Sequence, residues 1–228
     1  MSLGSVAAVL FLAVSVAPAV ATASVIGYLV GSVPVAVLVG RRRGIDLRTV
    51  GDRNPGYWNA KQQLFRQDAL LVFVGDAAKG LGAGVVGLVA NGGGRWWIAY
   101  VAVAAAMLGH AWPVFAGFRG GRSILTFAGG AFVLSPRAAL AALVLTIVVA
   151  VGCRSFAWGA RAGVFGYPVV QAFFDPRARV AATGCLMAII GLRFAMAAAA
   201  DRRKAPTGER RAAGASGANR RRSGPAKS

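Results

Sequence analysis

The stretch GHAWPVFAGFRGGRSILT places a titratable side chain near a cationic glycine turn within otherwise apolar sequence. His110 is the only histidine of the chain, and imidazole exchanges a proton near neutral pH. Further along, Gly120 and Gly121 permit a turn whose backbone N–H groups hold an anion. Arg119 and Arg122 flank the glycines, and a guanidinium group makes forked hydrogen bonds to phosphate. We predict proton transfer beside a phosphorylated ligand; the plainer alternative is a histidine with a structural role at the membrane boundary.

A second polar stretch, GIDLRTVGDRNPGYWNAKQQLF at residues 44–65, has the composition of an irregular loop. Glycines such as Gly56 interrupt regular structure, while Asn54 and Asn59 offer side-chain amides as hydrogen-bond partners. The composition supports a ligand-binding loop and a solvated connector equally.

Two charged side chains interrupt the apolar sequence that follows this loop. Asp76 and Lys79 are three residues apart, which places them on one face of a helix, where they can form an ion pair. Ionisable residues inside a membrane are costly and usually line a site or a cavity. We predict that this pair belongs to the site; the alternative is a structural ion pair near the membrane interface.

The composition indicates that membrane helices position these residues. The chain has 228 residues, of which 57% are hydrophobic, and its mean hydropathy is +0.60. A helix needs roughly 20 apolar residues to cross a hydrocarbon layer about 30 Å thick. Apolar stretches occupy approximately residues 4–21, 22–40, 69–90, 96–116, 123–134, 138–152, 156–174 and 179–199. We predict an all-α, polytopic transmembrane helical bundle of six to eight membrane helices with irregular cytoplasmic loops, in which 123–134 or 138–152 is short enough to be re-entrant.

The two ends of the chain differ in composition from its middle. The first two apolar stretches are joined by APAVATAS, which fits a turn between helices, one long kinked helix or a weak signal-peptide cleavage site. The missing positive charges near the N-terminus argue against cleavage. We predict an extra apolar segment at 1–21, a membrane domain at 22–199 and a basic disordered cytoplasmic tail at 200–228.

Basic residues outnumber acidic ones by 26 to 7, and their distribution orients the chain. Nine of the 26 follow Ala200, and seven lie between Arg41 and Arg66. Basic loops remain in the cytoplasm, so we place both regions and the FRGGR turn on that side of the cell inner (plasma) membrane. We expect the tail to contact anionic membrane lipids and expect no nucleic-acid partner. The pattern makes no prediction about oligomeric state.

In three segments the chain resembles the membrane-bound bacterial acyl-phosphate:glycerol-3-phosphate acyltransferases, over about residues 24–195. The family motif G-H-x-F-P-V-F-x-x-F-K-G-G-K-G-V-A-T is matched by Gly109, His110, Pro113, Val114, Phe115, Phe118, Gly120, Gly121 and Thr126. The motif G-I-D-I-R-x-V-G-S-G-N-x-G-A-T-N is matched by Gly44, Ile45, Asp46, Arg48, Val50, Gly51, Asn54, Gly56 and Asn59. A D-x-x-K-G element is matched by Asp76, Lys79 and Gly80.

The resemblance implies transfer of a fatty acyl group from acyl-phosphate to the 1-hydroxyl of glycerol 3-phosphate, which gives lysophosphatidic acid for phospholipid synthesis. It also implies a seven-helix membrane fold that uses no metal and no coenzyme A. We assign catalysis to His110 and Arg48, and the proton is removed either by His110 or by the phosphate of the substrate itself. Substrate binding is assigned to Asn54, Gly56, Asn59, Asp76, Lys79, Gly120, Gly121, Arg122 and Thr126.

This chain departs from the family motifs at several positions. Asp52-Arg53 replaces Ser-Gly and Tyr57-Trp58 replaces Ala-Thr, while Arg122-Ser123 replaces Lys-Gly. Ala157 and Ala160 stand where the family has serines, and the last helix has Arg193-Phe194 where the family has Arg-His followed by an asparagine. A noncatalytic membrane paralogue that binds phosphorylated lipid precursors is therefore the alternative, and a phosphate transporter is a third hypothesis.

Overall fold

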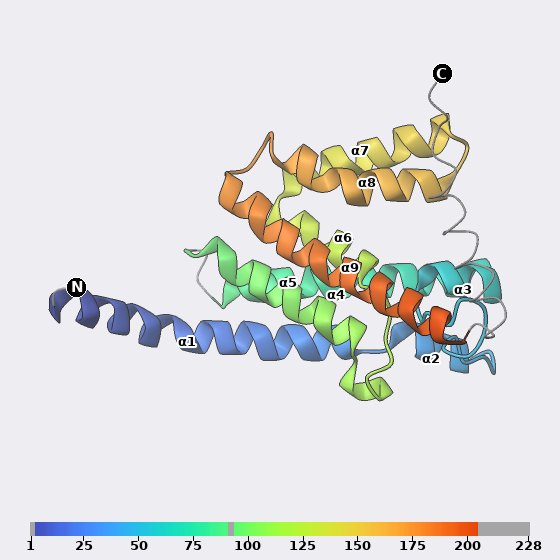
Figure 1. Ribbon diagram of the computed structural model, residues 1–228, viewed down its shortest axis with the longest axis horizontal. Helices are drawn as coiled ribbons and strands as arrows, with labels where there is room; N and C mark the ends of the chain where they lie inside the picture. The colour runs from blue at the N-terminus through green and yellow to red at the C-terminus, as the bar shows by residue number, and fades with distance from the viewer. Residues whose placement is uncertain (1–2, 91–93, 205–228) are drawn as a thin grey trace, which may run out of the picture. The chain divides into compact units, whose positions relative to one another are not determined.

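The computed structural model describes residues 3–90 and 94–204, and that part of the chain is all-α (Figure 1). Its elements are α1 (Leu3–Ser32), α2 (Val35–Arg41), α3 (Tyr57–Gln63), α4 (Arg66–Val89), α5 (Trp96–Ala111), the 3-10 turn η1 (Val114–Ala116), α6 (Ile124–Leu134), α7 (Pro136–Gly152), α8 (Phe156–Gln171) and α9 (Arg177–Lys204). The predicted helical class is confirmed.

Within residues 3–90 and 94–204, four helical stretches are long and apolar enough to cross a membrane. They are Val16–Arg41, Arg66–Val89, Trp96–Ala116 and Arg177–Arg202, and the shorter apolar helices are Ile124–Leu134 and Pro136–Gly152. A helix satisfies its backbone hydrogen bonds internally, as lipid demands. The chain is an integral membrane protein with several candidate spans, while the seven-helix count remains a prediction.

The predicted span 22–40 is interrupted near its middle. Helix α1 ends at Ser32 and α2 begins at Val35, so Pro34 lies in the break. Proline has no N–H to donate and disfavours helical backbone in the residue before it. By contrast, Pro18 lies inside α1, so the junction APAVATAS is helical, and the first predicted segment continues into the second as one helix up to Ser32.

Helices α1, α4, α5 and α6 pack closely around the polar residues. Helix α1 lies along α5 (Figure 1), and α4 contacts α1, α5 and α6. Close approach depends on glycine: a Cβ at Gly31 would collide with the backbone of Ala106, and one at Gly80 with the carbonyl of Thr126. Small residues at such contacts bring backbones together in membranes. This packing places residues of α4 beside the end of α5.

The predicted domain limits at 22–199 fall inside helices. Helix α1 runs through the first limit, and α9 runs through the second to Lys204, so the first residues of the predicted tail are helical. Residues 205–228 lie outside the described part of the chain. The chain divides into two units, and the boundary in the sequence falls between Ile190 and Gly191 within α9.

Candidate active site

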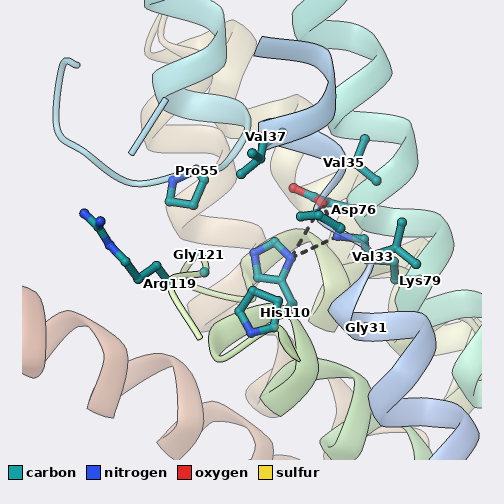
Figure 2. Close-up of a pocket in the computed structure, with 14 residues that line it drawn as sticks. Gly31, Val33, Val35, Val37, Pro55, Asp76, Lys79, His110, Arg119 and Gly121 are labelled. Carbon is teal, nitrogen blue, oxygen red and sulfur yellow. Dashed lines mark hydrogen bonds and ion pairs between the residues drawn. The ribbon is translucent and has the colours of Figure 1, made fainter. Parts of the chain in front are cut away.

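A small open hollow lies where the break between α1 and α2 faces α4 and the end of α5 (Figure 2). Its lining residues are Gly31, Val33, Pro34, Val35, Ala36, Val37, Pro55, Asp76, Lys79, His110, Pro113, Arg119, Gly120 and Gly121. Five of the predicted site residues, Asp76, Lys79, His110, Gly120 and Gly121, therefore line one hollow.

Asp76, Lys79 and His110 form a buried polar group at the base of this hollow. The Nζ of Lys79 donates to the Oδ1 of Asp76 at 2.8 Å, as their spacing on α4 predicted. The Nδ1 of His110 lies 3.5 Å from that oxygen and 3.5 Å from the Nζ of Lys79 (Figure 2). The side chains of Asp76, Lys79 and His110 are 2%, 6% and 8% exposed. The carboxylate of Asp76 thus contacts both the ammonium group of Lys79 and the imidazole of His110, and all three side chains are shielded from solvent.

The two glycines bring the turn into contact with His110. A Cβ at Gly121 would collide with the Nε2 of His110, and one at Gly120 with its carbonyl oxygen. The N–H of Gly121 donates to the His110 carbonyl at 3.0 Å. The expected anion-binding turn is therefore not formed by this N–H group. These positions require glycine because the two chain segments approach closely.

Arg48 lies outside the hollow and is held by a neighbouring carboxylate. Its Nη2 is 2.7 Å from the Oδ2 of Asp46, and its Nη1 donates to the carbonyl of Ala116 at 3.3 Å. The hydrogen bond from Arg48 lowers the pKa of Asp46 to about 2, against burial, which acts in the opposite direction. The same hydrogen bond raises the pKa of Arg48. Arg48 thus links the 44–65 loop to η1.

Arg122 also has a carboxylate partner and does not line the hollow. Its Nη1 lies 3.1 Å from the Oδ2 of Asp52 in the 44–65 loop. Neither Arg48 nor Arg122 is among the residues that line the hollow, and each faces an acidic residue instead. Arg119 reaches the hollow instead, on the side away from Lys79 (Figure 2).

The two asparagines of the 44–65 loop and Gly56 shape that loop. The Nδ2 of Asn59 is buried and donates to the carbonyls of Leu47 and Val50 at 2.9 and 3.0 Å. Gly56 precedes α3, and its N–H donates to the carbonyl of Asn54. Pro55, between Asn54 and Gly56, is the residue that lines the hollow.

Thr126 was also predicted to bind substrate, but it is fully buried in α6. Its carbonyl faces Gly80 of α4, so it contributes to helix packing outside the hollow.

One wall of the hollow, formed by the residues around the break between α1 and α2, was not predicted from the sequence. Gly31 and the segment from Val33 to Val37 line it, together with Pro113. Pro34 inside an apolar run was the signal available for this break, since proline interrupts a helix. The short helix α3 was also missed because Tyr57–Gln63 follows a cluster of loop-forming residues.

Two departures from the family motifs keep a backbone conformation that favours glycine. Arg53 has a φ of 57° and Ser123 a φ of 59°, and both stand where the motifs have glycine. Ser123 is buried, and its Oγ donates to the carbonyl of Met107 at 2.7 Å. A third departure, Tyr57, packs its ring edge-on against Phe73 of α4 and Phe156 at the start of α8.

Sequence comparison relates the chain to one family. The family model described as glycerol-3-phosphate acyltransferase matches residues 21–201. A protein named glycerol-3-phosphate acyltransferase from Rubrobacter xylanophilus is 43% identical over 129 residues, which are 57% of this chain and 64% of that protein. A relative of the same name from Neisseria meningitidis serogroup B is 39% identical over 163 residues, which are 70% of this chain and 79% of that protein.

Structure comparison agrees with the sequence comparison. The crystal structure of PlsY, an integral membrane glycerol 3-phosphate acyltransferase, in its glycerol 3-phosphate form matches with a TM-score of 0.68 and 26% identity. The match covers 76% of this chain and 87% of that one. The lysophosphatidic acid form matches with a TM-score of 0.66 and 24% identity, which shows likeness of fold.

Proposed function

The chain belongs to the glycerol-3-phosphate acyltransferase family, and we propose that its hollow is the active site at which a fatty acyl group passes from acyl-phosphate to glycerol 3-phosphate. The hydroxyl oxygen of glycerol 3-phosphate attacks the acyl carbon, the carbon–oxygen bond to phosphate breaks, and the products are lysophosphatidic acid and orthophosphate. The hydroxyl proton leaves during the attack. The enzyme must therefore hold two phosphorylated molecules and accept one proton.

His110 is the group that accepts the proton. With its Nδ1 protonated and donating towards Asp76, its Nε2 carries a lone pair on the side of Gly121. The contact of 3.5 Å between Nδ1 and Asp76 is long, as catalytic hydrogen bonds often are without substrate. When Nε2 takes the proton, the carboxylate of Asp76 balances the new charge. Lys79 holds this carboxylate in place through its own ion pair.

The arginines around the hollow bind the phosphates. Arg119 lines the hollow, while Arg48 and Arg122 lie on the two loops that approach it. A guanidinium group binds phosphate through two parallel hydrogen bonds. Arg48 and Arg122 reach substrate by exchanging their carboxylate partners for phosphate. We place this face of the protein at the cytoplasmic side of the inner membrane, where the basic loops belong.

The apolar wall of the hollow suits the acyl group. Val33 lies in the break between α1 and α2, Val35 and Val37 lie in the first turn of α2, and all three line the hollow together with Asp76 and His110. The observation that carries the proposal is this juxtaposition of a buried histidine–carboxylate pair with a valine-lined wall. The hollow thus combines a proton acceptor with an apolar surface against which an acyl chain can pack.

An acyl-transfer assay in detergent tests the proposal. Purified protein receives radiolabelled glycerol 3-phosphate with acyl-phosphate in one arm and acyl-coenzyme A in the other. We expect lysophosphatidic acid only in the first arm, and its loss in His110→Ala. Binding of glycerol 3-phosphate without turnover in the wild-type protein would support the noncatalytic paralogue instead, the alternative raised by Phe194 after Arg193.

A further inference from the structure

One ion pair joins the two loops that approach the hollow. The Nη1 of Arg122 lies 3.1 Å from the Oδ2 of Asp52, although seventy residues separate them in the chain. Gly121, directly before Arg122, lines the hollow, and so does Pro55, three residues after Asp52. The pair therefore lies at the border of the proposed site, and it connects two positions at which this chain departs from the family motifs.

The backbone around Asp52 fixes the direction of its carboxylate. The Oδ1 atom accepts a hydrogen bond from the N–H of Asn54 at 3.1 Å, which leaves Oδ2 for Arg122. Arg53, between these residues, adopts a left-handed φ of 57°, so the chain turns sharply here. The carboxylate is thus held by its own loop and directed at the guanidinium group.

Solvent reaches both members of the pair. The side chain of Arg122 is 24% exposed and that of Asp52 is 35% exposed. A partly solvated ion pair contributes little free energy, because water stabilises the separated charges nearly as well. A doubly charged phosphate group, which accepts the same forked hydrogen bonds as a carboxylate, can displace Asp52 from Arg122.

We propose that Asp52 is a positioning residue that competes with substrate phosphate for Arg122. Without substrate, its carboxylate holds the guanidinium at the border of the hollow, and phosphate binding replaces this contact. Asp52 thereby lowers the affinity of the site for weak anions and favours dianionic phosphate monoesters. The inference rests on the proposed function in one respect: it takes Arg122 to be a phosphate-binding residue.

Three variants test the competition. Asp52→Asn removes the charge but keeps an Oδ1 acceptor for the N–H of Asn54, so the turn is retained. Asp52→Glu keeps the negative charge. Asp201→Asn makes the same charge change at an exposed position late in α9 and serves as the control.

Orthophosphate binding by calorimetry in detergent is the first measurement, because it needs no turnover. Loss of a partly exposed ion pair is expected to tighten orthophosphate binding about two- to fivefold in Asp52→Asn. Asp52→Glu is expected to bind more weakly than Asp52→Asn, and Asp201→Asn is expected to match the wild type. Equal or weaker binding in Asp52→Asn, with an unchanged unfolding midpoint, overturns the inference.

Kinetics then identify the phosphate that Arg122 receives. In Asp52→Asn we expect the KM for one substrate, glycerol 3-phosphate or acyl-phosphate, to fall by about the same factor as the Kd for orthophosphate. The substrate whose KM falls is the one whose phosphate competes with Asp52 for Arg122. Unchanged KM values for both overturn the inference even if orthophosphate binds more tightly. Absence of turnover in the wild type refutes the proposed function but leaves the calorimetric test intact.

Discussion

The Nδ1 atom of His110 at the end of α5 lies 3.5 Å from the Oδ1 atom of Asp76 within α4, and both side chains are buried. This contact fixes which imidazole nitrogen faces the carboxylate and which faces the glycine turn. It also brings Lys79 into the same group, at 3.5 Å from the imidazole. The chemistry of the site therefore depends on how α4 packs against α5.

Asp76→Asn tests whether the carboxylate orients and balances His110. The amide presents no negative charge to a protonated imidazole, so we expect kcat to fall about 100-fold or more. The measurement is steady-state acyl transfer by protein that elutes as the wild type does in size-exclusion chromatography. In the double variant with His110→Ala, we expect no further loss beyond that of His110→Ala alone, because the two residues act together. If the loss of kcat in the double variant equalled the product of the two single losses, Asp76 and His110 would act independently, and the proposed pairing would be contradicted.

Gly121→Ala tests the close approach of the glycine turn to His110. The new Cβ would collide with the Nε2 of His110, so the imidazole or the turn must move. A displacement of about 1 Å costs on the order of 100-fold in rate. Gly82→Ala on α4 is the matched control, because a Cβ there meets nothing within 4 Å. We expect acyl transfer to fall in the first variant and to stay within twofold of wild type in the second; equal activities would show that the contact is unimportant.

Some features of the fold and the site followed directly from local sequence. Apolar stretches near spanning length predicted the long helices α4, α5 and α9, because lipid accepts a backbone whose hydrogen bonds are internal. The spacing of Asp76 and Lys79 predicted their ion pair, because residues three apart share a helix face.

Other features depend on contacts between distant segments. The contacts of His110 with Asp76 and of Arg122 with Asp52 are set by helix and loop packing, which no local pattern encodes. Gly120 and Gly121 were interpreted as an anion-binding turn, yet their role depends on a neighbour ten or more residues away. The break at Pro34 was hidden by the valines around it, whose hydropathy resembles that of a continuous span.

Ser123 tests the cost of a left-handed backbone at a position where the family motif has glycine. Ser123→Gly relieves the φ of 59° but loses the hydrogen bond to Met107, whereas Ser123→Ala loses the hydrogen bond and keeps the strained φ. We expect the glycine variant to be more stable than the alanine variant by about 1 kcal/mol. Thermal unfolding in detergent gives the order. An alanine variant as stable as the glycine variant would show that φ is relaxed at this position.

The ion pair between Asp46 and Arg48 predicts a defined pH dependence of stability. The pKa of Asp46 is lowered from 3.8 to about 2 by the hydrogen bond from Arg48, so the folded protein favours the charged carboxylate. The resulting stabilisation is fully present above the unfolded pKa of 3.8 and is lost as the pH falls through the folded pKa of about 2. We therefore expect the difference in unfolding midpoint between wild type and Asp46→Asn to be constant above the pKa of 3.8 and to shrink as the pH falls towards 2. The side chain of Asp46 is 33% exposed, so solvent screens the pair and the difference is expected to be small. A difference that keeps its full size as the pH falls below about 2 would show that Asp46 acts through packing, since its carboxyl group is then protonated in both the folded and the unfolded state.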